Sequence, residues 1–293
     1  MPKVLRVLAI VAGVLVGVVV IAVIAVFAIS GSNLNRTFEV TGDDLDIASV
    51  TDMEEAERLY ISRGCAGCHG ADGAGGILAD DPAIGRIVST NLTTLDYTPA
   101  EYELAIRHGL HPDGTPMLIM PSEDWITYSD EEIAHIIAYM ETFEPVENDL
   151  TAQQIGPLGR FLIATDPGSL LPAYTIDHSL EAPATVEAEV SVVYGEYIGQ
   201  LCMGCHGDNL AGGPVPGEGP DAPPASNLTP SESGIAAYTE EDLFASLREG
   251  IRPDGSALDP AYMPWPSFSQ LNDTEISALW AYLQSIDAVE NEY

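Results

Sequence analysis

Residues 60–76 read YISRGCAGCHGADGAGG, and residues 197–213 read YIGQLCMGCHGDNLAGG. The two stretches align without a gap. Further matches follow in the same order: STNLT (89–93) with ASNLT (225–229), RHGLHPDG (107–114) with REGIRPDG (248–255), and SDEEIAHIIAYM (129–140) with NDTEISALWAYL (272–283). Ordered similarity of this kind indicates an internal duplication. The chain therefore contains one domain twice, at residues 52–143 and 191–288, joined by a linker at 144–190.

Each copy is predicted to be all-α. A short amphipathic helix precedes the cysteine motif, and two later helices begin at polar residues that have an acidic residue three positions further on, the pattern of an N-terminal cap. The predicted cap residues are Thr98, Ser129, Thr239 and Asn272. No segment in either copy alternates regularly between polar and apolar residues, so we expect two small helical bundles with long loops and no strands.

The N-terminal segment is predicted to cross a membrane. Residues 7–29 are 23 consecutive apolar residues without a charge, and about 20 such residues span a bilayer as a helix. A cleaved signal peptide is the alternative, but its apolar core is normally shorter. Lys3 and Arg6 precede the span, which predicts a cytoplasmic N-terminus. We assign residues 1–30 to the cytoplasmic tip and anchor and 31–51 to a tether.

The charge is strongly one-sided. The chain has 10 basic and 45 acidic residues, and beyond the anchor eight arginines face all 45 acids, a net charge of −37. Nucleic acid is excluded as a natural partner because its phosphates would be repelled. A field of this sign attracts redox partners with basic docking surfaces. Adaptation to a saline habitat explains the same composition, and the two explanations are compatible.

All four cysteines lie in two CxxCH motifs, at Cys65, Cys68 and His69 and at Cys202, Cys205 and His206. CxxCH is the attachment signature of a covalent c-type haem. Two CxxC pairs could instead share a zinc ion, but the histidine after each pair would then have no role. A disulfide leaves the same histidines unexplained. We predict two covalently bound haems, one in each copy.

Both copies resemble class I cytochrome c domains. The resemblance rests on CxxCH after a helix bearing an aromatic residue (Tyr60, Tyr197), on a later Met-Pro, and on a closing helix that contains Ala-Tyr. The order NLT, acidic helix start, RxGxxPDG and MP is similar to the cytochrome subunits of membrane-bound bacterial alcohol and sugar-acid dehydrogenases. Those subunits typically carry three haems, whereas this chain has two motifs. One anchor before two haem domains also resembles the di-haem subunit of cbb3-type oxidases.

The resemblance implies a methionine on the far side of each haem iron, from a loop before the last helix. In the second copy Met263, followed by Pro264, is the candidate, since Met203 lies within the CxxCH turn. In the first copy Met120 also precedes a proline and lies at the same distance from the closing helix, whereas Met117 does not. The predicted axial ligands are therefore His69 with Met120 and His206 with Met263. His108 or His111 as the far ligand of the first haem is the minority alternative.

Four further repeated residues are candidates for weaker roles. Arg107 and Arg248 recur in a chain with few bases, and a guanidinium suits a haem propionate. Asn91 and Asn227 open the paired NLT segments and would contact either a propionate or their own loop. The linker contains an apolar helical turn from Ile155 to Ile163, which we expect to pack against the domains. His178, also in the linker, has no assigned role.

The predicted function is single-electron transfer, because six-coordinate His/Met haems leave no open position for a substrate. We expect a membrane-tethered di-haem carrier in the bacterial cytoplasmic membrane, with its haem domains on the periplasmic or outer side. The alternative is a fixed electron-transfer subunit of a dehydrogenase or terminal oxidase complex. A di-haem peroxidase, the third hypothesis, requires a haem with a displaceable ligand. No substrate chemistry of its own is otherwise expected.

Overall fold

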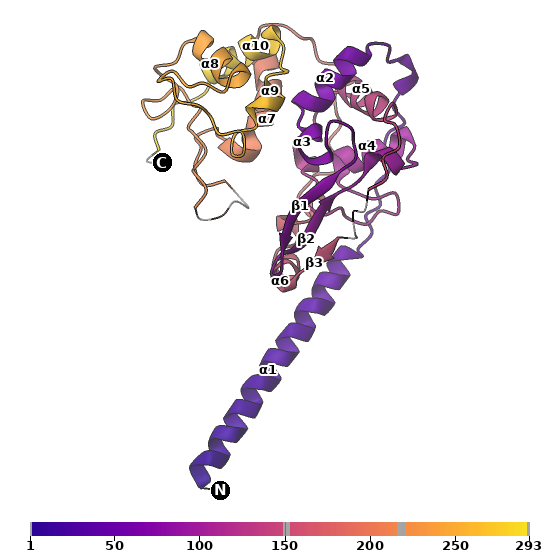
Figure 1. Ribbon diagram of the computed structural model, residues 1–293, viewed down its shortest axis with the longest axis vertical. Helices are drawn as coiled ribbons and strands as arrows, with labels where there is room; N and C mark the ends of the chain where they lie inside the picture. Colours follow the sequence, from indigo (N-terminus) through magenta and orange to yellow (C-terminus); the bar gives the residue numbers. More distant parts are fainter. Residues whose placement is uncertain (1, 149, 151–152, 216–218, 220, 292–293) are drawn as a thin grey trace.

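The computed structural model describes residues 2–148, 150, 153–215, 219 and 221–291. One long helix leads into two helical domains that lie side by side (Figure 1). The elements before the linker are α1 (Lys3–Leu34), α2 (Met53–Ser62), α3 (Cys65–His69), β1 (Gly76–Asp81), β2 (Gly85–Ser89), α4 (Pro99–His108) and α5 (Asp130–Met140). The linker and second domain contribute β3 (Gln154–Ile155), α6 (Pro157–Thr165), α7 (Val192–His206), α8 (Glu240–Arg248), α9 (Trp265–Phe268) and α10 (Asp273–Leu283). Short 3-10 turns occupy Ile47–Ser49, Leu92–Thr94, Ser122–Asp124, Pro167–Ser169 and Pro172–Tyr174.

Helix α1 projects from the domains as an isolated rod (Figure 1). An 18-residue window within it has a mean hydropathy of 3.3 and no buried residue. At about 1.5 Å per residue, its 32 residues are long enough to cross a bilayer. An apolar helix without protein around it is consistent with the predicted anchor.

The predicted helix starts are confirmed. Thr98 caps α4 through a capping box in which the Thr98 hydroxyl accepts from the Glu101 amide (3.3 Å) and the Glu101 carboxylate accepts from the Thr98 amide (2.8 Å). Capping boxes also start α8 at Thr239 and α10 at Asn272. Ser129 caps α5 through its hydroxyl. These bonds satisfy amides that the first turn of a helix otherwise leaves unpaired.

Both cysteine motifs are helical, but the backbone that leads into them differs. In the first copy Gly64 adopts φ 88° and separates α2 from α3. The equivalent residue of the second copy is Leu201, which continues the helix, so that α7 runs for 15 residues through the whole motif. A positive φ is readily accessible only to glycine, which explains why the break occurs in the first copy.

The prediction of an all-α fold without strands was wrong in one respect. Strands β1 and β2 form an antiparallel hairpin, and β3 from the linker extends it on the β2 side. The register is irregular between Ile77 and Ala79, so Leu78 is a bulge. Both Ile77 and Leu78 are exposed, and a bulge of this kind removes the alternation by which a strand is recognised in sequence. In the second copy only the first rung of the hairpin, Gly213 with Ala225, is seen among the described residues.

A continuous apolar core runs through both domains. It contains Tyr60 and Ile137 from the first copy and Ile198 and Leu279 from the second, all almost fully buried. Helices α2 and α5 pack together in the first domain, as α7 and α10 do in the second. Because one core is shared, the two cysteine motifs are expected to keep a constant separation.

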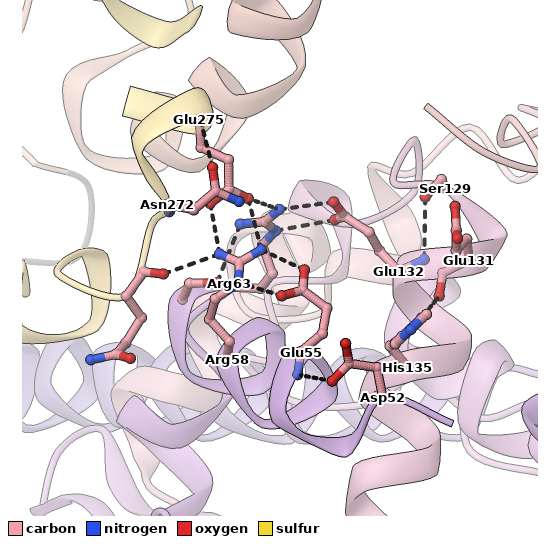
Figure 2. Close-up of polar contacts among 12 residues, drawn as sticks. Asp52, Glu55, Arg58, Arg63, Ser129, Glu131, Glu132, His135, Asn272 and Glu275 are labelled. Atoms are coloured by element: carbon pink, nitrogen blue, oxygen red, sulfur yellow. Dashed lines mark hydrogen bonds and ion pairs between the residues drawn. The ribbon is translucent and has the colours of Figure 1, made fainter. Parts of the chain in front are cut away.

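Buried ion pairs join the domains beside this core (Figure 2). Arg63, directly after α2, is fully buried and bonds to Glu132 of α5 and to Glu275 of α10, each at 2.8 Å. Arg58 also reaches Glu275 at 2.6 Å, and the Glu275 side chain is itself fully buried. Burial alone raises the pKa of Glu275, but Arg63 and Arg58 hold that pKa below its usual value. Glu275 is thus an ionised carboxylate of the second domain that neutralises arginines of the first.

Candidate haem sites

The histidine of each CxxCH motif is oriented by a backbone carbonyl. His69 Nδ1 lies 2.9 Å from the carbonyl oxygen of Thr90, and His206 Nδ1 lies 2.7 Å from that of Ser226. A carbonyl can only accept, so Nδ1 carries the proton and donates it, which leaves the Nε2 lone pair available to a metal. Metal-ligating histidines typically have this arrangement. Both carbonyls lie directly before the asparagine of NLT, so this loop holds the histidine in the same way in both copies.

The two histidines are neutral, as an iron ligand must be, and the first cysteine of each motif is protonated. Burial lowers the pKa of His69 and of His206, partly offset by the carbonyl bonds, so both imidazoles are neutral at pH 7. Burial raises the pKa of Cys65 and of Cys202 to about 12. Within the described residues no group of three or more Cys, His, Asp or Glu side chains converges as a metal site. The zinc alternative thus has no support in the structure.

The second domain contains an open crevice at its cysteine motif. One cavity of about 1050 Å³, counting the part open to solvent, is lined by Cys205, His206 and Met263. A second of about 560 Å³ has the same three residues in its wall together with Cys202 and aliphatic side chains such as Leu247. Because both cavities contain His206 and Met263 in their walls, they are two parts of one crevice. A crevice with mainly apolar walls and a few polar groups is typical of a site for an organic cofactor.

Backbone hydrogen bonds align the methionines of the two copies. The Ser122 amide donates to the Met120 carbonyl, and the Trp265 amide donates to the Met263 carbonyl, both at 2.7 Å. Met120 and Met263 therefore occupy the same tight Met-Pro turn. Met120 is partly buried and packs against the core, as Met263 does.

The same comparison aligns Met117 with a residue that cannot bind iron. The Met117 amide donates to the Gly109 carbonyl at 2.7 Å, and the equivalent bond of the second copy joins Leu258 to Gly250 at 2.7 Å. Met117 is thus the counterpart of a leucine, whose side chain cannot bind iron.

Three other histidines, at positions 108, 135 and 178, have protein partners. His108 Nδ1 lies 3.0 Å from Nδ1 of His178, and His178 Nε2 lies 3.0 Å from the Ala173 carbonyl. Burial lowers the pKa of His108 to about 4. His135 Nδ1 lies 2.7 Å from the Glu131 carbonyl oxygen. The structure thus gives His178, for which the sequence predicted no role, a position against the end of α4.

Arg107 and Arg248 connect helices. The Arg107 guanidinium is buried, pairs with Glu103 (2.9 Å) and Asp130 (2.8 Å), and donates to the Tyr128 carbonyl. Arg248 repeats this arrangement near the surface with Asp273 (2.6 Å) and the Leu271 carbonyl. Each arginine thereby ties the helix after the NLT loop to the start of the closing helix. These bonds give each arginine a structural role in its domain.

Asn91 and Asn227 hold the end of each domain. The Asn91 amide donates to the Val146 carbonyl, and the Asn227 amide donates to the Val289 carbonyl. Their side-chain oxygens accept from Thr93 and Thr229 two residues further on. The sequence predicted contact either with a propionate or with the residue's own loop. The observed bonds are contacts within the loop and with the end of the domain.

Three aromatic side chains in the described part of the chain have buried donors without a partner, and none of the three lines the crevice. Within the described residues, Trp125 Nε1, Tyr128 Oη and Trp265 Nε1 are buried and have no hydrogen-bond partner. Such atoms are costly unless something accepts from them. The oriented histidines and the crevice that contains His206 and Met263 fit a covalently bound haem.

A helical domain with CxxCH, a histidine oriented through Nδ1 and a Met-Pro turn before the closing helix defines a c-type haem protein. The cytochrome c family model matches residues 53–144 and 193–287. The chain belongs to the cytochrome c family, and the prediction of covalent haem c is confirmed at that level.

Three relatives place it further. The fructose dehydrogenase cytochrome subunit of Gluconobacter japonicus is 29% identical over 266 residues, 78% of this chain and 51% of that protein. The cytochrome c subunit of alcohol dehydrogenase (quinone) from Gluconobacter oxydans is 40% identical over 102 residues, 32% of this chain and 21% of that protein. A diheme cytochrome c-type protein of Cereibacter sphaeroides is 27% identical over 292 residues, 87% of this chain and 93% of that protein. The chain therefore spans about half of one dehydrogenase subunit and about a fifth of the other, and the likeness to such subunits confirms the predicted resemblance.

Proposed function

We propose that this chain is a membrane-anchored di-haem cytochrome c that passes single electrons between redox partners on the extracytoplasmic side of a bacterial cytoplasmic membrane. The observation that carries the proposal is the exact repetition of the site. Each domain has CxxCH, a histidine with Nδ1 bonded to a carbonyl, and a methionine in the same Met-Pro turn. Each repetition would hold one haem, which supplies a one-electron ferric/ferrous couple when bound.

The proposed ligands are His69 and Met120 for the first haem and His206 and Met263 for the second, with thioethers to Cys65, Cys68, Cys202 and Cys205. With both axial positions taken by side chains, no iron coordination position remains for a substrate, which disfavours the peroxidase hypothesis. His/Met ligation is the combination that raises a haem's reduction potential.

The membrane anchor rests on α1. Lys3 and Arg6 lie on one side of its apolar run, and the positive-inside rule then puts the two haem domains outside the cytoplasm. Covalent attachment through CxxCH would keep each haem in place in a domain that is small and rich in loops.

The experiment is a spectroelectrochemical titration of the wild type beside Met120→Ala, Met117→Ala and Met263→Ala. Two haems per chain and two one-electron waves are expected in the wild type. Met120→Ala and Met263→Ala should each remove one methionine–iron absorption band and lower one potential. Met117→Ala is the matched control and should change neither. A single wave, or loss of the band in Met117→Ala, contradicts the proposal.

A fixed subunit of a dehydrogenase is the second candidate, favoured by the likeness to alcohol and fructose dehydrogenase cytochrome subunits. Purification in mild detergent separates the two. Co-elution with a flavin or quinoprotein subunit supports the complex, and elution as a lone chain supports the free carrier.

A further inference from the structure

Helix α6 is attached to the outer end of α1. Asn33 Nδ2 donates to the Ile163 carbonyl at 2.8 Å, and the Arg160 guanidinium lies over the Phe27 ring at 5.4 Å and donates to the Ser30 hydroxyl at 3.4 Å. Figure 1 shows α6 at the edge of the first domain closest to α1. Since the uncharged apolar run of α1 ends at Ile29, α6 lies at the level where that run ends.

The exposed face of α6 is apolar. Gly159 and Ile163 are buried on its inner face, where Gly159 lies against the Ile84 carbonyl of the hairpin turn. On the outer face Leu158 and Phe161, three residues apart, are 44% and 49% exposed. Residues three apart lie on one side of a helix. The outer face of α6 therefore presents a leucine and a phenylalanine to the surroundings.

This apolar face continues the surface of α1. Phe27 and Ile29 at the end of the run are 49% and 48% exposed, and Arg160 lies directly beside Phe27. In a chain with few bases, an arginine at the end of an apolar span is at the depth of lipid headgroups, and the side chains next to it are at the boundary of the acyl chains.

We infer that α6 lies in the interfacial zone of the bilayer beside α1, with Leu158 and Phe161 inserted among the upper acyl chains and Arg160 at the headgroups. The inference rests on the proposed membrane anchor. The occupant is lipid because the face is continuous with a helix whose apolar surface is itself uncovered. Asp81 of the hairpin turn and Asp166, which ends α6, flank the site, so zwitterionic headgroups suit it better than strongly anionic ones.

The membrane contact of α6 bears directly on the first haem site. The Leu158 amide donates to the Ala83 carbonyl in the hairpin turn at 2.8 Å. At the far end of the same hairpin, the Ser89 hydroxyl donates to the Cys68 carbonyl at 2.6 Å. A two-stranded hairpin thus connects α6 with the CAGCH turn. The first domain is held at a constant height over the membrane, and it is the domain that would exchange electrons with a membrane-embedded partner.

The test uses the full-length, haem-loaded protein in phosphatidylcholine nanodiscs, with a spin label at Phe161→Cys. The four native cysteines are consumed by haem attachment, so the new thiol is labelled alone. Power saturation with oxygen, which enters lipid, and with a water-soluble nickel chelate measures the environment. The Phe161→Cys label should favour oxygen, as a label at Val16→Cys in α1 does. The matched control is Val193→Cys, because Val193 is 76% exposed in the second domain and should favour the nickel reagent.

Two results overturn the inference. A label at position 161 that responds to the nickel reagent like the one at 193 lies in water, and a label shielded from both reagents is covered by protein. Failure of the Val16→Cys label to favour oxygen is a different outcome, because it contradicts the anchor itself and with it the membrane part of the proposed function.

Discussion

Replacing Glu275 by glutamine should destabilise the protein more than any exposed acid-to-amide change. The substitution keeps the size of the side chain and leaves an oxygen to accept from the Asn272 amide, which Glu275 binds at 2.7 Å. It removes the charge that Arg63 and Arg58 bind at 2.8 and 2.6 Å. The effect thus isolates the buried ion pairs shown in Figure 2.

The magnitude follows from burial. Removing one partner of a buried pair typically costs 3–5 kcal/mol, because the remaining charge stays in the interior unpaired. Arg63 keeps Glu132, whose side chain is 15% exposed, and Arg58 is itself 17% exposed. Both arginines are therefore partly compensated, and the lower end, about 3 kcal/mol, is expected. The matched control is Glu55→Gln, which removes a 38% exposed partner of Arg58 and should cost no more than about 1 kcal/mol.

The assay is denaturant unfolding followed by far-ultraviolet circular dichroism. The wild type should unfold in one transition, because its core is shared, and Glu275→Gln should lower the midpoint and separate the domains into two transitions. Arg63→Met combined with Glu275→Gln should recover part of the loss, since fewer unpaired charges then remain. The reasoning is refuted if Glu275→Gln costs no more than Glu55→Gln.

Four other outcomes are expected. Burial, with a smaller contribution from Glu123, raises the pKa of Asp124 to about 6, so the folded state loses stability as pH rises from the ordinary aspartate value of about 3.9 through 6. Asp124→Asn should then gain up to about 2 kcal/mol in urea unfolding at pH 7 and almost nothing at pH 3. Glu275 has a lowered pKa, so its contribution to folding stability is present above the unfolded-state pKa of about 4.3 and is lost as pH falls below it. The difference in urea midpoint between the wild type and Glu275→Gln should therefore shrink from pH 7 to pH 3. In urea unfolding, Arg107→Met should lower the free energy of unfolding by about 3 kcal/mol, because its ion pair with Glu103 is buried. Arg248→Met should lower it by less than about 1 kcal/mol, because the side chains of Arg248 and Asp273 are 39% and 81% exposed. Gly64→Leu, which copies the second domain, should lower the thermal midpoint because Gly64 has φ 88°, while Gly67→Ala, with open space at its Cβ, should not.

Much of each haem site was predictable because its signals are local. CxxCH is a contiguous motif, and the helix starts at Thr98, Thr239 and Asn272 depend on residues three positions apart. The Met120 assignment depended on comparison with the second copy, and the structure supports it through equivalent backbone bonds. The hairpin 76–89 was missed, since its bulge at Leu78 removed the alternation that marks a strand.

The duplication, the haem-binding chemistry and the apolar run of α1 were determined by the sequence itself, since each can be recognised from contiguous stretches of residues without knowing which stretches meet in space. Only the tertiary structure shows which residues far apart in the sequence are in contact. Arg63 meets Glu275 across 212 positions, and Arg160 meets Phe27 at the end of α1. No local pattern encodes such pairs, because a charge or an apolar side chain has the same appearance in the sequence whether folding brings it to water, to an opposite charge or to lipid.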